Sequence, residues 1–199
     1  MTIKGVIETG RRGWLTTFAV VMALGAVSLG APVAANAAGK NSVVMSVEVK
    51  AAASDVWKLV GAFDKLQDWH PAVESSTVTG SPTAVGTQRT LHLKGGGDIQ
   101  EALTSYSDEN MRLTYAILSG PLPVANYESY IGVVDEGSGK SLVIWGSTFD
   151  AGGGATDKKA KEVITSVYKA GLDNLKKKFG AAPAAKAAPK AKKAHKKKK

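Results

Sequence analysis

The longest regular pattern of apolar and polar positions lies near the end of the chain, over residues 156–179. Apolar side chains recur there at steps of three and four, which places them on one stripe of a helix about 36 Å long. Lysines and acids fill the opposite face. Thr156 fits the N-cap position and Gly180 the C-terminal stop. The stripe consists of Val163, Ile164, Val167, Tyr168, Leu172, Leu175 and Phe179.

Strand patterns dominate the chain before this helix. Residues 42–49 are rich in β-branched side chains and predict the first strand. Residues 53–63 form an amphipathic helix pattern with Ser54 as its N-cap, and residues 64–69 predict a second short helix. After these, turn residues separate strand patterns only. Six more strands are expected over residues 73–79, 87–93, 98–107, 112–118, 126–135 and 142–149.

This order predicts an α+β fold in which a curved, seven-stranded antiparallel sheet surrounds the long C-terminal helix. A flat sheet does not cover so long a helix, so the strands must curl, and the two short helices close one end. A cavity is expected between sheet and helix, with Val163, Val167 and Tyr168 facing it. Gly171 would let the helix approach the sheet closely. The alternative is a surface helix on an ordinary α+β core.

Several local motifs occur along the chain in a recognisable order. The resemblance is to the helix-grip superfamily, which includes plant pollen allergens, START lipid-transfer domains and polyketide cyclase/dehydrase proteins; its small bacterial polyketide-cyclase-like branch is most similar. It covers about residues 42–179 and implies a helix-grip fold, with enzymes among some members. The motifs are Val56-Trp57, Phe63-Asp64, Trp69-His70-Pro71, Gly86-Thr87-Gln88-Arg89, Glu101, Pro123-Val124 before Tyr127, Trp145, and residues 171–176.

Arg89 and Glu101 are the most informative charged residues. Alternation along residues 87–93 places Arg89 on the apolar face of its strand and His92 on the opposite face. Glu101 likewise falls in the apolar row of residues 98–107. An unpaired buried charge is very costly, so the two side chains should meet each other or a polar group of a ligand. Three interpretations stay open: a structural ion pair, an anchor for a ligand head group, and acid/base catalysis.

Aromatic side chains supply further candidates for the wall of a small-molecule cavity, because their hydroxyl and indole groups give directional contacts. The alternative is plain core packing, which we expect for Trp57 and Phe63. His70 precedes Pro71 at the predicted rim and is a candidate ligand contact or general base. The predicted ligand-binding set is Trp69, His70, Arg89, Glu101, Tyr115, Tyr127, Trp145, Val167 and Tyr168.

The patterns that would indicate a metal, a cofactor or a catalytic nucleophile do not occur. The chain has no cysteine, which excludes a disulfide framework and a thiolate site. No His/Asp/Glu spacing suggests a metal site, and no serine-centred nucleophile elbow is present. The glycines at 95–97 lack the lysine and following helix of a phosphate loop, so they predict a hairpin. We therefore predict no catalytic residue, no metal and no cofactor.

Residues 1–37 have the pattern of an export signal. Three basic residues precede an uncharged apolar run at 14–29, and Ala35-Asn36-Ala37 is a small-x-small cleavage site. We expect cleavage after Ala37 and a periplasmic location; the alternative is an uncleaved membrane anchor. Arg11-Arg12 also resembles a twin-arginine signal, so the export route stays open.

The net charge of +9 belongs to the two ends of the chain. Residues 180–199 hold eight lysines and no acid, whereas residues 38–179 hold 15 basic and 16 acidic residues. The segment 181–199 contains little besides alanine, proline and lysine, and we expect it to be disordered. Its possible roles are a solubilising tail or contact with an acidic protein or an anionic membrane surface. Nucleic acid is not favoured, because the tail lacks aromatic residues for base stacking.

The sequence therefore predicts an exported domain over residues 38–180 that binds or transfers a hydrophobic or amphipathic small molecule. Two alternatives stay open. One is a cyclase or dehydratase enzyme, which the superfamily resemblance implies for some members. The other is an accessory protein of a periplasmic redox system that docks through its basic tail, because an exported member also resembles the accessory protein found with periplasmic methanol oxidation.

Overall fold

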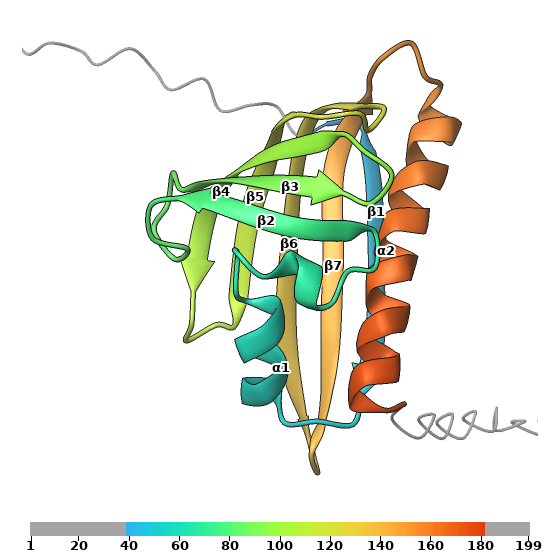
Figure 1. Cartoon of the computed structure of the whole chain (residues 1–199). Helices are drawn as coiled ribbons and strands as arrows, with labels where there is room; N and C mark the ends of the chain where they lie inside the picture. The colour runs from blue at the N-terminus through green and yellow to red at the C-terminus, as the bar shows by residue number, and fades with distance from the viewer. Residues whose placement is uncertain (1–38, 182–199) are drawn as a thin grey trace, which may run out of the picture. The chain divides into compact units, whose positions relative to one another are not determined.

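The computed structural model describes residues 39–181 (Figure 1). The predicted export signal and the lysine-rich tail lie outside these residues, apart from Ala181. The described elements are β1 (Asn41–Val49), α1 (Ala53–Val60), η1 (Leu66–Asp68), β2 (Val73–Thr79), β3 (Gln88–Leu93), β4 (Asp98–Ser107), β5 (Arg112–Ser119), β6 (Val124–Gly137), β7 (Lys140–Ala151) and α2 (Asp157–Phe179).

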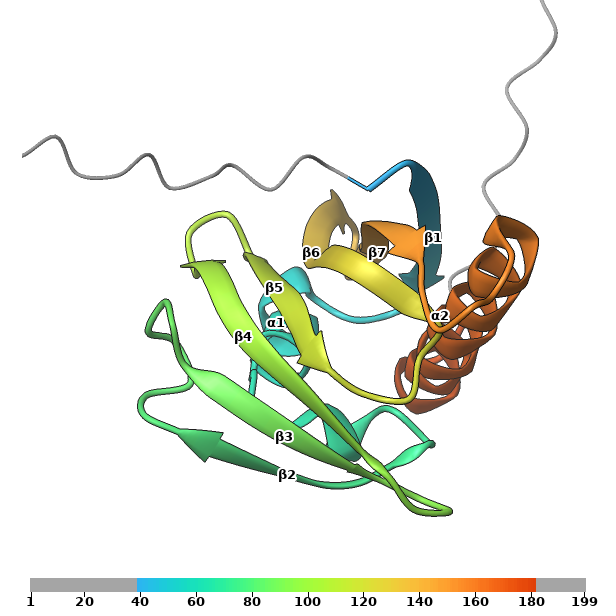
Figure 2. The same cartoon turned by 90° about the horizontal axis from the view of Figure 1, so that it is seen from above.

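All seven strands form one antiparallel sheet in the order β1-β7-β6-β5-β4-β3-β2. Strands β2 to β7 follow one another as hairpin neighbours, and β1 pairs with the free side of β7. The sheet curls, so that β2 and β3 turn out of the plane of β6 and β7 (Figure 2). The predicted α+β helix-grip architecture is confirmed.

Helix α2 lies along the inside of the curl and packs against β1 and β7. The Thr156 hydroxyl accepts a 3.2 Å hydrogen bond from the backbone N–H of Lys159, which confirms the predicted N-cap. Gly180 ends the helix with a positive φ of 84°. The buried side of α2 consists of Ala160, Ile164, Tyr168, Gly171, Leu172 and Leu175. Within residues 39–181, no helix is long and apolar enough to cross a membrane.

Two local predictions around α1 were wrong. The N-cap is Ala52, which has extended backbone and no capping side chain, so Ser54 lies inside the first turn. The helix ends at Val60 rather than at Phe63. The Phe63 carbonyl accepts a hydrogen bond from the Arg89 side chain, so this part of the backbone is bonded to the sheet instead of continuing the helix. The predicted second short helix is present as the 3-10 helix η1.

The remaining boundaries agree with the predicted ones to within two residues, and those of β2 and β4 match at both ends. Strands β6 and β7 extend further into their shared turn than expected, because the register continues to the pair Gly137 and Lys140. The chain after α2 returns to the sheet, where the Lys50 N–H donates a 3.1 Å hydrogen bond to the Gly180 carbonyl. Ala181 forms an isolated bridge with Val49. The C-terminal end of α2 is therefore joined to the end of β1 and the residue after it.

Candidate ligand-binding cavity

A cavity of about 250 Å³ lies between the inner face of the sheet and α2. Side chains from η1, the segment after it, strands β2 to β7 and α2 form its wall. Most of them are aliphatic, as expected for the inward rows of a curled sheet. The lining residues are Leu66, His70, Ala72, Val73, Leu91, Leu93, Ile99, Glu101, Tyr115, Ile117, Leu122, Tyr127, Trp145, Ile164 and Val167.

Arg89 and Glu101 form a buried ion pair on neighbouring strands. The sheet register places them directly opposite each other, and Nε of Arg89 lies 2.5 Å from Oε2 of Glu101. Only 5% of Arg89 and 4% of Glu101 is exposed. The prediction that the two charges meet is confirmed. Burial raises the pKa of the Glu101 carboxyl, and the positive charge of Arg89 opposes that shift.

The two members of this pair differ in what they present to the cavity. Glu101 lines it, whereas the Arg89 guanidinium lies over the rings of Phe63 and Tyr115, 4.1 Å and 5.1 Å from their centroids. Its Nη1 donates a 2.6 Å hydrogen bond to the Phe63 carbonyl. Arg89 does not line this cavity but borders a separate void of about 10 Å³. The acid is therefore the member of the pair that a ligand would meet.

A network of hydroxyl and indole groups lies at the α2 side of the cavity. The hydroxyls of Tyr127 and Tyr168 are 2.6 Å apart, and that of Tyr168 is 3.1 Å from Oγ of Ser129. Nε1 of Trp145 donates to the hydroxyl of Tyr115 at 2.9 Å and to Ser129 at 3.2 Å. Burial raises the pKa of Tyr168 to about 12 and also raises those of Tyr115 and Tyr127. The three phenols are therefore neutral hydrogen-bond donors near neutral pH.

His70 connects the segment after η1 to the middle of α2. Its Nε2 lies 3.0 Å from the carbonyl oxygen of Val167, and its Nδ1 accepts a 3.3 Å hydrogen bond from the N–H of Ala72. This pairing assigns the neutral ring with its proton on Nε2. Burial lowers the pKa of His70, partly opposed by the bond to Val167, and Arg89 lowers it further. Both ring nitrogens are thus engaged within the protein.

The stability of the fold should fall in mild acid because of His70. Its folded-state pKa lies below its ordinary value of 6.5, so the unfolded chain binds the proton more tightly. The contribution of neutral His70 is complete above pH 6.5 and is lost as the pH falls below it, by at most about 1.4 kcal/mol per pH unit. Urea unfolding between pH 7.5 and 5 should show this slope in the wild type and a smaller one in His70→Gln. Equal slopes would contradict the assignment.

Trp69 and Gly171 lie where the segment around His70 packs against α2. The ring of Trp69 meets that of Trp145 edge to face, with centroids 5.2 Å apart. The carbonyl of Trp69 accepts a 2.9 Å hydrogen bond from Nδ2 of Asn174. A Cβ atom on Gly171 would lie 2.8 Å from His70 and 2.9 Å from the rings of both tryptophans. The predicted close approach at Gly171 is therefore present, and its partners are three aromatic rings.

The similarity to known proteins agrees with this architecture. Residues 40–180 match the family described as "Polyketide cyclase / dehydrase and lipid transport". The chain belongs to this family. Its helix-grip fold and inner cavity are thus those of a member of a ligand-binding family.

Three proteins illustrate how this family member relates to others. Abscisic acid receptor PYL7 of Arabidopsis thaliana is 29% identical over 126 residues, which are 60% of this chain and 59% of the receptor. The chain thus spans about three fifths of the receptor's length. The solved structure of XoxI from Bacillus cereus is 33% identical with a TM-score of 0.65, over 69% of this chain and 94% of that one. The Zhui aromatase/cyclase from Streptomyces sp. R1128 shares the fold at 15% identity and a TM-score of 0.58, over 71% of this chain and 99% of that one.

The structure brings most of the predicted site residues of this family member to the cavity. Those that line it are His70, Glu101, Tyr115, Tyr127, Trp145 and Val167. Trp69, Arg89 and Tyr168 lie behind the wall, and Tyr168 stacks on Trp145 with centroids 4.3 Å apart. Val163 is half-buried and does not line the cavity. Contact of any of these residues with a ligand stays a prediction.

Sequence reasoning missed much of the aliphatic wall. The inward alternation along β3, β4 and β5 identifies several of these positions, but an apolar residue gives no signal that separates a cavity wall from a packed core. The missed residues are Leu66, Ala72, Val73, Leu91, Leu93, Ile99, Ile117, Leu122 and Ile164.

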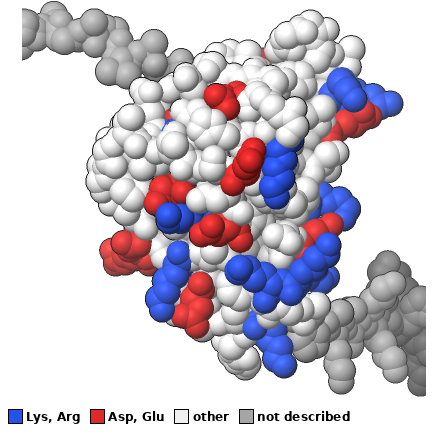
Figure 3. All heavy atoms as spheres, in the orientation of Figure 1, with Lys and Arg blue, Asp and Glu red and all other residues white. Residues whose placement is uncertain are grey.

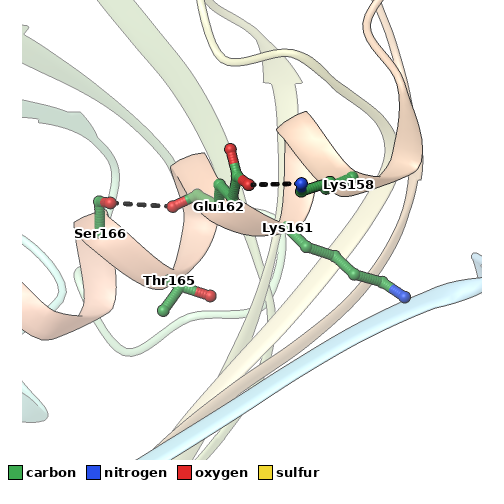
Figure 4. Close-up of a pocket in the computed structure, with 5 residues that line it drawn as sticks. All are labelled: Lys158, Lys161, Glu162, Thr165 and Ser166. Atoms are coloured by element: carbon green, nitrogen blue, oxygen red, sulfur yellow. Dashed lines mark hydrogen bonds and ion pairs between the residues drawn. The ribbon is translucent and has the colours of Figure 1, made fainter.

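A second hollow lies on the exposed side of α2 (Figure 4) and consists of Lys158, Lys161, Glu162, Thr165 and Ser166. It is open to solvent, and its polar groups are partly engaged with the helix: Ser166 donates to the Glu162 carbonyl at 2.9 Å, and Lys158 lies 4.0 Å from the Glu162 carboxylate. Charges of both signs mix on the face that carries α2 (Figure 3). No cluster of three potential metal ligands occurs within residues 39–181.

Proposed function

We propose that this protein binds a hydrophobic or amphipathic small molecule in the cavity between the sheet and α2. The observation that carries the proposal is the lining: an interior wall that is aliphatic and aromatic, interrupted by one carboxylate and two phenols. Ligand pockets combine an apolar lining with a few placed polar groups in this way. The family description includes lipid transport, and the related PYL7 is named as a receptor for abscisic acid.

The size of the cavity limits the ligand. An apolar cavity of about 150 Å³ holds benzene, and pockets for drug-sized ligands start at roughly 300 Å³. At about 250 Å³, this cavity has room for a small ring with a short substituent. A larger lipid would require the wall to move.

Binding without catalysis is favoured over the cyclase or dehydratase alternative. Fold alone does not determine whether a family member is an enzyme. Both nitrogens of His70 are engaged, and the raised pKa values of Tyr115 and Tyr127 disfavour the phenolate forms that nucleophilic attack would require. Glu101 is the remaining group with acid/base chemistry in the wall, and Arg89 holds one of its oxygens.

We further propose that this binding takes place in the cell envelope, because residues 1–37 have the pattern of a cleaved export signal. The eight lysines of residues 180–199 would add electrostatic contact with an acidic protein or an anionic membrane surface. Such contact also suits the alternative role as an accessory protein of a redox system. Native mass spectrometry of the protein from its own periplasm would detect cleavage after Ala37 and any copurifying ligand or partner.

Filling the cavity should abolish binding. Ile117 lines the cavity, whereas its neighbour Leu118 points outward and is 51% exposed. Ile117→Trp should occupy the space with an indole ring, and Leu118→Trp is the matched control. With propylbenzene as the probe, NMR shift changes at cavity residues are expected in the wild type and in Leu118→Trp but not in Ile117→Trp. Binding that survives in Ile117→Trp would place the site elsewhere.

A further inference from the structure

The charges of the cavity wall carry information on the ligand. Glu101 is the one carboxyl group among the lining residues, and the hydrogen bonds of His70 fit its neutral ring. The remaining polar groups are the phenols of Tyr115 and Tyr127 and the indole of Trp145. Among residues 39–181, the lining includes no lysine or arginine, so this part of the chain offers the cavity no cation that would neutralise an acidic ligand.

One oxygen of Glu101 lacks a hydrogen bond. Arg89 holds Oε2, and no hydrogen bond joins Oε1 to any residue between 39 and 181. Glu101 is not among the described residues that have a fully buried polar atom without a partner, so this oxygen can be reached by a small polar group from the cavity that the side chain lines. A ligand that donates a hydrogen bond to Oε1 would use the carboxyl oxygen that Arg89 leaves free, in an interior where such a bond is stronger than in water.

Arg89 does not offer its own charge to the cavity. Its Nε donates to Glu101, its Nη1 donates to the Phe63 carbonyl, and the rings of Phe63 and Tyr115 flank the guanidinium. A ligand carboxylate would therefore meet the carboxylate of Glu101 rather than a cation. Two carboxylates that share a buried site disfavour each other's ionised form.

A positively charged ligand is disfavoured because it would add a second positive charge beside the ion pair. Arg89 already neutralises Glu101 at 2.5 Å. An ammonium group beside Glu101 would leave one uncompensated positive charge in the interior, and such burial is unfavourable. A neutral donor completes Oε1 without adding charge.

We propose that the cavity selects a neutral ligand with a hydroxyl or N–H group that donates to Glu101, and that it rejects carboxylates and ammonium ions of the same size. This inference rests on the proposed function. The ligand class follows from Glu101, which is the member of the ion pair that lines the cavity.

Four probes of matched shape test it: 2-phenylethanol, propylbenzene, phenylacetate and 2-phenylethylammonium. Calorimetric or NMR titration of the full mature protein should show 2-phenylethanol binding at least about tenfold more tightly than either ion. It should also bind several-fold more tightly than propylbenzene, which has a methyl group in place of the hydroxyl.

Two variants test whether the preference for 2-phenylethanol depends on Glu101. The double variant Arg89→Met/Glu101→Leu should bind propylbenzene and lose the advantage of 2-phenylethanol over it. Glu128→Gln, on an exposed residue of β6, should leave the order of affinities unchanged.

Each result separates the two proposals. An ion that binds as tightly as the alcohol, or propylbenzene that equals it, would overturn the ligand class while cavity binding stands. An advantage of the alcohol that persists in the double variant would overturn the role of Glu101. If none of the four probes binds, both the ligand class and the proposed function are contradicted.

Discussion

Glu101→Leu should lower the free energy of unfolding by about 3–5 kcal/mol. The substitution leaves Arg89 inside the protein at 5% exposure, still held by the Phe63 carbonyl but without its counter-charge. Breaking a buried pair from one side is costly because the remaining charge has lost its solvation and its partner. Equilibrium urea unfolding, followed by circular dichroism, measures the loss.

The double variant Arg89→Met/Glu101→Leu tests whether the loss of stability comes from the broken ion pair or from the other contacts of Arg89. Removing both charges leaves only the Phe63 carbonyl without its donor, a cost of about 1–3 kcal/mol. The double variant should therefore be more stable than the single variant, although it carries one more substitution. A double variant less stable than Glu101→Leu would show that Arg89 contributes mainly through its other contacts. The effect of Glu101→Leu would then have another origin.

Gly171→Val should destabilise the protein by about 3 kcal/mol, at the upper end of the usual cost of overpacking a core. The new Cβ would lie within 2.9 Å of the rings of Trp69, His70 and Trp145. These rings are buried and contact one another, so a shift of one ring displaces the others. The gain in helix propensity over glycine, at most about 1 kcal/mol, is too small to offset this.

Ser166→Val is the matched control for the same experiment. It places the same side chain on the exposed side of α2, where nothing packs against it. Its effect should stay within about 0.5 kcal/mol. Thermal unfolding of both variants compares them directly. Equal losses would mean that valine is poorly tolerated in this helix generally, and the contact of Gly171 with the aromatic rings would then explain nothing.

The parts of the fold that follow from the spacing of apolar residues, and from the cost of burying an unpaired charge, were predictable from the sequence. The alternation in β3 and β4 was sufficient to bring Arg89 and Glu101 together, because an isolated charge in an apolar row requires a partner. The stripe and caps of α2 were equally informative. The outline of the sheet followed from strand patterns separated by turn residues.

What the sequence did not show is which inward residues border empty space. Tyr168 belongs to the apolar stripe of α2, yet its hydroxyl is hydrogen-bonded to that of Tyr127 and its ring stacks on Trp145. Leu91 and Ile99 follow the same inward pattern as core residues and line the cavity instead. The difference depends on the curvature of the sheet and on ring orientations, which arise from contacts far apart in the sequence.

The contacts of α2 with Trp69 and His70 also affect how the protein opens. Hydrogen bonds join Val167 to His70 and Asn174 to Trp69, across 97 and 105 residues of sequence, and Gly171 lies between them on the helix. Segments joined in this way open as one cooperative unit, because neither keeps its buried contacts when the other departs. Amide protons in the second half of α2 and around η1 should therefore share one protection level in hydrogen exchange. A molecule held in the cavity would slow the exchange of both together.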